Sequence, residues 1–244
     1  MAKNAYIGVD NVARKVKQPY IGVDNVARKV KSGYVGIDNV ARQCFELYSG
    51  PSVGDLAVGT SVYLNGKEFI VIHQGYPSDV YHESCDGTWV MMKSSTIITH
   101  SDKHSFLTEN IFSWYIGEAF KDVVKSVQVP YDTGQGFLFN EQPCPAFLLS
   151  ATEIGLNKGT TLYEGTVLDY FKDGDTSKLI TYYDSLNVVS SWWLRTQIGM
   201  TAYIVTSEGT LSTTSVTYSN SMIARAALIL PPSTHIDENL NVIP

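Results

Sequence analysis

The chain has 244 residues and a formal net charge of −6, with 44% hydrophobic and 17% charged residues. The apolar share is sufficient for a globular core, and the acidic balance argues against nucleic acid or an anionic membrane as the main partner. No apolar run reaches the roughly 18 residues of a membrane-spanning helix, so we expect no membrane insertion. The first residues lack the apolar segment of a signal peptide. We therefore expect synthesis in a cytoplasm, with any outside role reached after lysis or on a particle.

A 14-residue repeat occupies the start of the chain. Residues 6–17 recur unchanged at 20–31, and residues 34–42 repeat the pattern with two conservative exchanges. Each repeat holds an AspAsn pair, which tolerates the positive φ of a tight turn. Each is therefore predicted to be a β-hairpin, with Val9 opposite Val12 and Ile7 opposite Arg14. Because a lone hairpin is only marginally stable, we expect residues 1–47 to mount the protein or to mediate self-association.

The remaining chain is expected to form one globular domain over 52–232, followed by a tail at 233–244. Two strands around an AsnGly turn at 65–66 and several strands from Trp192 onward are predicted from alternating apolar residues. Apolar residues at helical spacing favour a helix over 108–124, and 162–171 is a second candidate. Long irregular loops are expected at 125–145 and 172–190. The predicted class is α+β.

Sequence motifs of common enzymes are missing. The chain has no phosphate-binding loop, no dinucleotide-binding glycine pattern and no serine-hydrolase elbow. Cys44, Cys85 and Cys144 are odd in number and contain no CxxC pair, which predicts neither a disulfide framework nor a zinc site. We expect no catalytic residues and no cofactor.

Three short segments contain residue types that can bind metals. His100 and His104 have a spacing that suits a metal only on a helix, whereas their neighbours predict a loop. The tripeptide at 141–143 resembles a calcium-binding segment of animal lectins, but the second ligand segment of those lectins is absent. The AspGlyAsp at 173–175 is typical of a turn. We expect no metal.

Two C-terminal segments carry a resemblance to a known family. The sequence TrpTrpLeuArgThr at 192–196 and ArgAlaAlaLeuIleLeuPro at 225–231 resemble segments of C-type-lectin-like domains in gut-bacterial and phage proteins. Residues 148–155 and 56–69 are similar to two further segments of that family. Ala226 is a departure, because the family often has proline there. The resemblance covers about residues 52–232 and implies a lectin-like fold, which formylglycine-generating enzymes share.

The resemblance also implies where a ligand would bind. Related folds include the variable proteins of diversity-generating retroelements, whose recognition residues lie between two motifs of this kind. The matching stretch here is 197–224, joined by residues just before Trp192. The candidate ligand-binding residues are therefore Tyr183, Asn187, Gln197, Ile198, Met200, Thr201, Tyr203, Ser212, Thr214, Thr217, Tyr218 and Asn220. Tyr side chains among small polar residues are also the composition of a binding loop.

Four residues are assigned structural roles. Trp192 and Trp193 are adjacent in a predicted strand, so one is expected in the core while the other could lie at the surface. Arg195 and Arg225 are expected to form buried, charge-assisted hydrogen bonds.

The leading hypothesis is a non-catalytic binding protein of a phage or prophage. It would recognise a protein or glycan on a cell surface through a variable C-terminal face, with a trimer suggested by analogy. One alternative is a particle assembly protein that acts through residues 1–47. The other is an enzyme of the formylglycine-generating type, whose reactive cysteine pair cannot be placed in this sequence.

Overall fold

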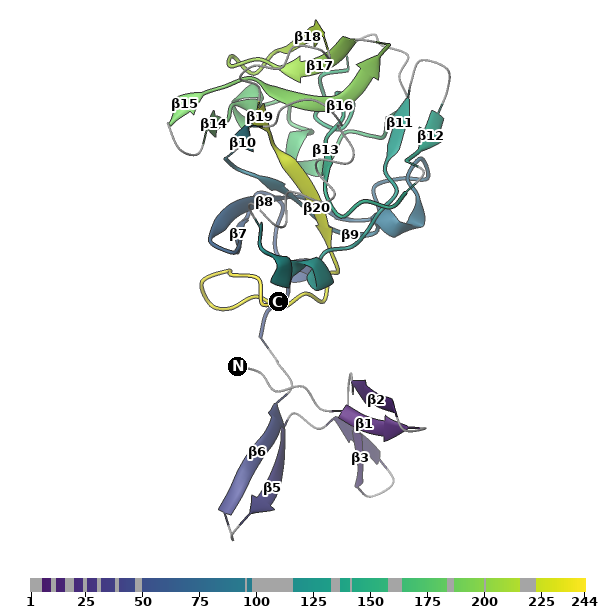
Figure 1. Cartoon of the computed structure of the whole chain (residues 1–244), viewed down its shortest axis with the longest axis vertical. Coiled ribbons are helices and arrows are strands. Elements are labelled where there is room, and N and C mark those ends of the chain that lie inside the picture. The colour runs from purple at the N-terminus through teal and green to yellow at the C-terminus, as the bar shows by residue number, and fades with distance from the viewer. Residues whose placement is uncertain are drawn as a thin grey trace. The chain divides into compact units, whose positions relative to one another are not determined.

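The computed structural model describes residues 50–94, 96–97, 116–132, 137–140, 142–157, 164–183, 187–199, 201–215 and 223–244, together with six strands before residue 47. The chain divides into two compact units, Met1–Pro51 and Ser52–Pro244. Figure 1 shows the strands of both units.

The first unit consists of three separate β-hairpins. Each hairpin is a separate two-stranded antiparallel sheet. In the first hairpin, Val9 pairs with Val12 and Ile7 pairs with Arg14, as predicted. The strands are β1 (Tyr6–Val9), β2 (Val12–Lys15), β3 (Tyr20–Val23), β4 (Val26–Lys29), β5 (Ser32–Ile37) and β6 (Val40–Glu46).

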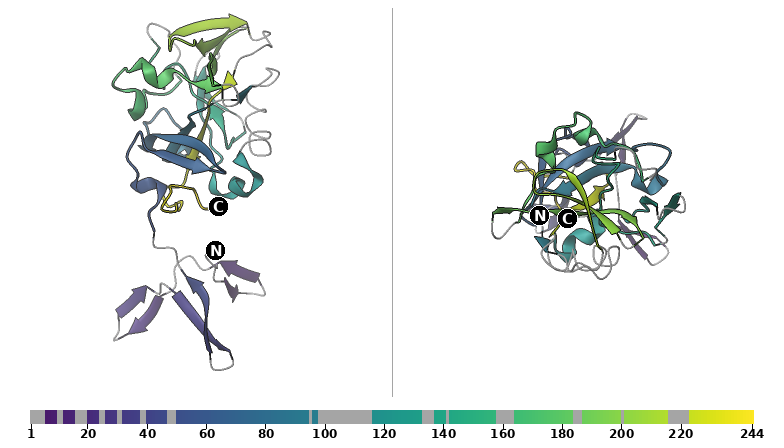
Figure 2. Two further views of the ribbon diagram at one scale, coloured as in Figure 1. Left: turned by 90° about the vertical axis from the view of Figure 1, so that its left-hand side faces the viewer. Right: turned by 90° about the horizontal axis from the view of Figure 1, so that it is seen from above.

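The second unit is built on two five-stranded sheets, both mostly antiparallel. The first has the order β13-β20-β9-β8-β7 and the second the order β10-β19-β16-β17-β18. Figure 2 shows them at different levels of the unit, with β17 and β18 at one end. The first sheet contains β7 (Ser61–Leu64), β8 (Lys67–Gly75), β9 (Gly87–Met92), β13 (Phe147–Leu148) and β20 (Ala226–Leu230). The second contains β10 (Thr96–Ile97), β16 (Trp192–Ile198), β17 (Thr201–Val205), β18 (Leu211–Ser215) and β19 (Ile223–Ala224).

Shorter elements connect the sheets. Two additional hairpins pair β11 (Pro130–Asp132) with β12 (Phe137–Phe139) and β14 (Tyr182–Tyr183) with β15 (Val188–Val189). Ile116 is π-helical, and the other described helical elements are 3-10 helices of three to six residues: η1 (Val53–Asp55), η2 (Glu83–Cys85), η4 (Glu118–Val123), η5 (Asp169–Phe171) and η6 (Thr176–Leu179). No helix in these described ranges is long and apolar enough to cross a membrane.

The expected α+β, C-type-lectin-like class is wrong, because the described part of the chain is mainly β. Of the helix expected at 108–124, the first eight residues lie outside the described part. In the remainder, Ile116 is π-helical and η4 is a 3-10 helix, so most of the described residues here are helical but not α-helical. At 162–171, residues 164–168 are not helical and only η5 follows. The intervals 125–145 and 172–190, expected as loops, hold the two short hairpins. At 162–171 the apolar spacing misled, because Leu168 and Phe171 are buried in an apolar cluster from a non-helical segment and a short 3-10 helix.

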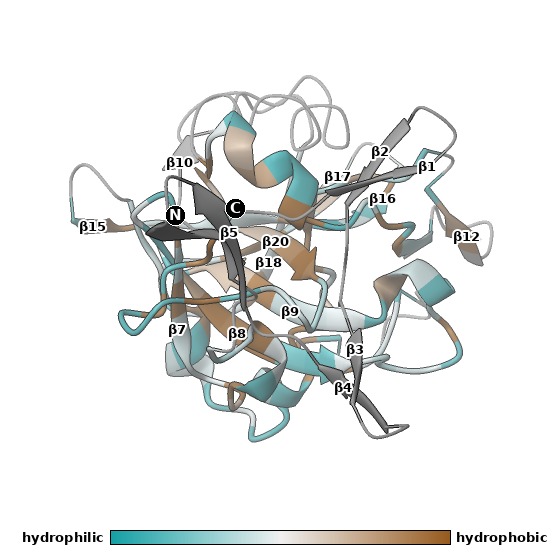
Figure 3. Ribbon diagram, turned by 90° about the horizontal axis from the view of Figure 1, so that it is seen from below, coloured by the Kyte–Doolittle hydropathy of each residue, from teal (hydrophilic) through white to brown (hydrophobic). Residues whose placement is uncertain are grey.

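Both faces of the first sheet are covered. Successive residues of β8 alternate between two apolar clusters, with Phe69 and Val71 in one and Ile70 and Ile72 in the other. Figure 3 shows the resulting concentration of hydrophobic residues on β8 and β20. The two clusters thus place apolar packing on both sides of the sheet, which explains its nearly continuous apolar sequence.

A segment near residue 240 completes the outer edge of β7. The Tyr63 amide donates to the Leu240 carbonyl at 2.9 Å, and the Val242 amide donates to the Tyr63 carbonyl at 2.8 Å. Ile236 and Val242 are buried in the same apolar cluster as Phe69. The segment that the sequence suggests is a tail is therefore part of the packed unit.

We expect Ile236→Ala to lower the free energy of unfolding by about 2–5 kcal/mol, because it removes a fully buried side chain from the core. Ile243→Ala is the matched control, since Ile243 is 37% exposed and its truncation should change little. Urea unfolding of both variants measures the difference. Equal stabilities would show that this segment is not packed as described.

Candidate functional site

The C-terminal candidate residues gather on the sheet β16–β17–β18. In this sheet Ile198 pairs with Thr201, and Thr201 pairs with Ser215, so the three side chains share one face. Tyr203 and Thr213 form the next pair on the same face. Ile198 is 45% exposed, and Thr201, Thr213 and Ser215 are also exposed. We call Ile198, Thr201, Thr213 and Ser215 the exposed corner.

Tyr203 marks where this face becomes core. Its ring is only partly buried, yet it packs against the same apolar cluster as Trp192 and Val205. The face therefore changes along the strands, from buried at Val205 to exposed at Thr201. Thr213 and Ser215 were not among the candidates, although the alternation of β18 around Ser212 and Thr214 could have identified them.

Three candidates lie on the opposite face of the sheet. Gln197 pairs with Ala202, Ala202 pairs with Thr214, and Ile204 pairs with Ser212. Ala202 and Ile204 are buried in the first cluster, so this face turns toward the interior. The structure therefore separates Gln197, Ser212 and Thr214 from the exposed corner. A single binding face that includes all candidates is excluded, because adjacent strand residues point to opposite sides.

Tyr183 and Asn187 belong to the hairpin β14–β15. Tyr183 is partly buried against the core, whereas Asn187 is exposed in the turn with a positive φ of 51°. Tyr182 and Val188 are 49% and 55% exposed on the same hairpin. Both belong to the stretch before Trp192 that was expected to join the binding face, although neither was named as a candidate. The remaining candidates, Met200, Thr217, Tyr218 and Asn220, lie outside the described residues.

Both Trp192 and Trp193 are buried, in keeping with the structural role assigned to them, and neither lies at the surface. Trp193 packs in the first apolar cluster and Trp192 in the second. They point to opposite sides of β16, as adjacent strand residues must, but both sides are covered at this position. The Trp192 indole also donates to the Leu179 carbonyl at 2.8 Å.

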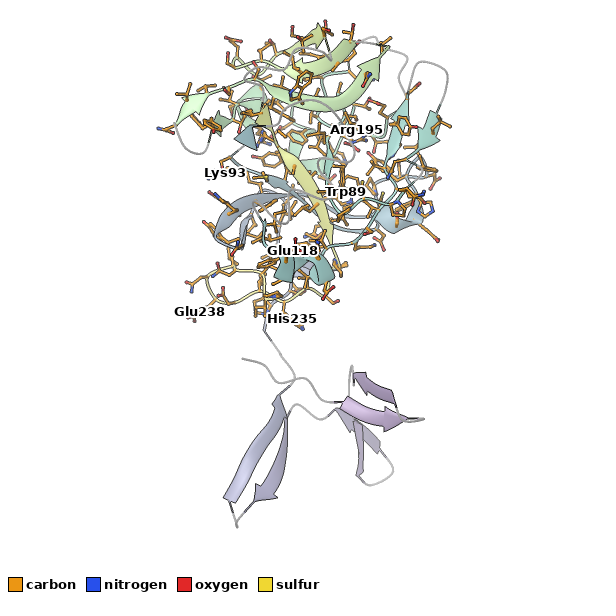
Figure 4. The ribbon with its side chains drawn as sticks, in the orientation of Figure 1. Trp89, Lys93, Glu118, Arg195, His235 and Glu238 are labelled. Atoms are coloured by element: carbon orange, nitrogen blue, oxygen red, sulfur yellow. The ribbon has the colours of Figure 1, made fainter. Side chains whose placement is uncertain are left out.

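Arg195 forms a buried ion pair beneath the exposed corner. Its guanidinium donates to both carboxylate oxygens of Glu153, each at 2.6 Å, and the two side chains are 1% and 0% exposed. The remaining donors reach the carbonyls of Pro130, Leu148 and Glu164 at 2.8–3.0 Å. Figure 4 shows Arg195 within the unit, near β16. This pairing raises the pKa of Arg195 above its ordinary value, despite burial.

Further hydrogen bonds surround the ion pair, at Glu153 and at the nearby Glu164. The Tyr81 hydroxyl donates to Glu153 at 2.9 Å, and the Ser150 amide donates to its other oxygen at 2.9 Å. Close by, the Glu164 carboxylate accepts from the Asp132 amide and from the Thr196 hydroxyl. Burial raises the pKa of Glu164, and the nearby Arg195 opposes that shift. Every charge in this network therefore has a hydrogen-bonded partner, which is the condition for tolerating buried charge.

Arg225 is buried without a carboxylate partner among its described contacts. It donates to the carbonyls of Met92 at 3.1 Å and Lys178 at 3.2 Å, and its guanidinium lies 5.1 Å from the ring centroid of Trp192. Burial lowers the pKa of Arg225 to about 10. The side chain is positively charged at neutral pH and joins β19–β20 to β9 and η6.

The cysteines have the properties of packed side chains. Burial raises the pKa of Cys85 to about 12 and that of Cys144 to about 11, so both thiols are protonated at neutral pH. A protonated thiol is a poor nucleophile and a poor metal ligand. Cys44 lies in β6 of the first unit.

Of the three segments that could supply metal ligands, the one at 173–175 is fully described by the structure. Asp173 accepts from the Asp175 amide at 3.1 Å and pairs with Lys178, so this segment is a turn. Across the described ranges, no three His, Cys, Asp or Glu side chains are grouped as a metal site. His100, His104 and Glu141 lie outside those ranges.

We expect Glu153→Gln to lower the free energy of unfolding by about 3–5 kcal/mol, because it removes the ion-pair partner of the buried Arg195 guanidinium. Glu118→Gln is the matched control. Glu118 also forms an ion pair, with Lys121, but both of these side chains are at least half exposed. We therefore expect little change in the free energy of unfolding. Thermal and urea unfolding measure both variants. A Glu153→Gln protein as stable as Glu118→Gln would contradict the assigned pairing.

Comparison with known proteins gives a family and no described activity. No curated protein and no solved structure matches the chain. Residues 86–232 match the family model described as a domain of unknown function (DUF6273). These residues include β9, the Arg195–Glu153 pair, the exposed corner and β20. Since the match spans more than half of the chain, this protein belongs to the DUF6273 family.

Proposed function

We propose that this protein is a non-catalytic binding protein that contacts its ligand through the exposed corner. The observation that carries the proposal is the contrast between this corner and the structure beneath it. Ile198, Thr201 and Thr213 are exposed side chains on paired strands, while Arg195 on the same strand β16 is fixed by five hydrogen bonds. Side chains displayed on a rigid support can change without loss of the fold.

The charge of the corner favours a neutral ligand surface. Residues 1–51 hold eight Lys or Arg and four Asp or Glu, so the remaining ten basic and twenty acidic residues give residues 52–244 a net charge of −10. No charged residue occurs between Glu208 and Arg225. Hydroxyl groups beside an exposed isoleucine suit hydrogen bonding and apolar contact with a protein or glycan. The hairpin β14–β15, which lies in the same half of the unit as β16 (Figure 1), adds the exposed apolar side chains of Tyr182 and Val188.

The biological setting that we propose is the surface of a phage or prophage particle. Support comes from the similarity of residues 192–196 and 225–231 to segments that flank the variable residues of retroelement-diversified proteins. The exposed corner lies between these two segments in the sequence. In this setting the protein would be made in a cytoplasm, would become extracellular on lysis, and would bind a molecule on a cell surface.

Assembly through the first unit is a second candidate function, favoured by its hairpins. Each hairpin is a separate two-stranded sheet, which is marginally stable without a partner. Three nearly identical copies would multiply any weak contact. Self-association, or attachment to a larger particle, would supply the missing packing.

Sequencing of natural variants of this gene tests the binding proposal. We expect substitutions within codons 181–224 to concentrate at exposed positions such as Ile198 and Thr201, because these side chains do not support the fold. Trp193, Arg195 and Arg225 should be spared, since all three are buried. Even variation along the whole chain would contradict a variable binding face and would favour the assembly function.

The tolerance of the exposed corner to substitution can be measured directly. We expect Ile198→Asn to leave the melting temperature nearly unchanged, because this side chain is 45% exposed at the end of β16. Ile204→Asn, six residues away and 8% exposed, should cost at least about 3 kcal/mol by placing an amide in the core. Calorimetry of the two full-length variants provides the comparison. Similar destabilisation by both substitutions would contradict the claim that side chains of the exposed corner do not support the fold.

A further inference from the structure

His73 is a buried titratable side chain that lies outside both the exposed corner and the Arg195 network. It belongs to β8, is 8% exposed, and meets the Trp89 ring of β9 edge to face, with ring centroids 6.4 Å apart. Its Nδ1 atom lies 2.7 Å from a carboxylate oxygen of Asp169 in η5. Histidine changes its charge closer to neutral pH than other side chains do. A titratable group therefore sits in the contact between β8 and η5.

The surroundings of His73 suit the neutral ring better than the charged one. Both ring nitrogens are shielded from water, and neither has a hydrogen-bond partner with normal geometry among the described residues. The neutral ring carries one N–H group, which can lie beside Asp169 when it is on Nδ1. The protonated ring carries a second N–H group on Nε2, which has neither an acceptor nor access to water. Because a buried donor without an acceptor is costly, protonation is favoured only once the ring is hydrated.

The charges around His73 only partly oppose the effect of burial. Burial lowers the pKa of His73 below its ordinary value of 6.5, Asp169 raises this pKa, and Lys172 lowers it. Lys172 also pairs with the other carboxylate oxygen of Asp169 at 2.6 Å, so the carboxylate is shared between two cationic partners when His73 is protonated. From β9, the Trp89 ring faces His73 and carries no charge. The closed contact between β8 and η5 thus favours a neutral His73 at pH 7.

The element η5 is the part of this contact that can move most readily. It is three residues long, so it has too few internal hydrogen bonds to be stable by itself. The Leu168 amide donates to the Glu153 carbonyl at 3.0 Å, and Lys178 donates to the Tyr170 carbonyl at 2.7 Å. By contrast, β8 is paired with strands on both sides. Since short elements with few hydrogen bonds open at a lower free energy than central strands, displacement of η5 is the easiest way to hydrate His73.

We propose that His73 and Asp169 form an acid-sensitive latch, which holds η5 against β8 at neutral pH and releases it when His73 is protonated. In the open form His73 takes up a proton near pH 6.5, whereas in the closed form it does so only at lower pH. Above pH 6.5 the ring is neutral in both forms, and the latch is fully closed. Between these two pH values the opening equilibrium constant rises as the pH falls, by up to tenfold per pH unit.

Hydrogen exchange of the full-length chain tests the release of η5. We expect the protection factors of the Leu168 and Phe171 amides, corrected for intrinsic exchange, to fall by up to tenfold per pH unit below pH 6.5. Amides in the central strand β9 should keep their protection, because the release is local. Equal protection of Leu168 and Phe171 at pH 7 and pH 5 would overturn the latch. The measurement involves no ligand, so its result is independent of the proposed binding function.

An exposed lysine allows the latch to be tuned without disturbing the core. The Lys172 side chain is 63% exposed, so Lys172→Gln should fold normally. It removes the cation that opposes protonation of His73, and we therefore expect both the His73 titration and the release of η5 to move to higher pH. Lys121→Gln is the matched control: Lys121 is also exposed and paired with a carboxylate, that of Glu118 in η4, and its loss should leave both unchanged.

NMR titration of the assigned histidine ring resonances, in the wild-type chain and in these two variants, gives the midpoint for His73 directly. A wild-type midpoint below pH 6.5 that rises in Lys172→Gln and stays constant in Lys121→Gln is the expected result. A wild-type midpoint at or above 6.5 would overturn the latch, as would a midpoint that does not rise in Lys172→Gln.

Discussion

The architecture of the second unit depends on the buried pair between Arg195 and Glu153. Removing two charges from water costs several kcal/mol for each, and the cost is offset only when the geometry is good and every remaining polar atom is bonded. Both conditions hold here, because each Glu153 oxygen accepts two hydrogen bonds and each described Arg195 donor atom has an acceptor. The pair joins β16 to the turn at 150–155, to β11 and to the loop at 164–166. A strand anchored in this way can hold exposed side chains in place at its far end.

The strand β16 carries both buried core residues and exposed side chains of the corner. Covering both faces of β16 at Trp192 and Trp193 makes the strand part of two apolar clusters. Five residues after Trp193 this cover has ended, and Ile198 is exposed to solvent. The exposed corner is therefore a consequence of where packing stops. Its extent is set by the length of β16 and β17 beyond the core.

Local signals predicted some elements of this fold and missed others for identifiable reasons. The AsnGly turn at 65–66 and the repeat hairpins follow from residues adjacent in sequence, and the structure has both. The pairing of Tyr63 with Asn241 involves residues far apart, so no local pattern indicates it. Glu153 could have been inferred as the partner of Arg195, since buried charges are paired and Glu153 lies in the largely apolar segment LeuLeuSerAlaThrGluIleGly. The division of candidates between two faces required the register of β17 and β18, which the sequence does not specify.

The closure of β7 has a consequence for the order of folding. The hairpin β7–β8 has a local turn and can form as soon as residue 75 is synthesised, but the segment that completes its edge lies about 180 residues later. During synthesis, the amide and carbonyl of Tyr63 on the edge of the β7–β8 hairpin therefore lack the partners that they have in the folded unit. Slow translation or truncation before residue 240 would prolong that exposure and favour aggregation. A chaperone that holds extended apolar segments would be most useful to this protein between the synthesis of β8 and of the β7-completing segment.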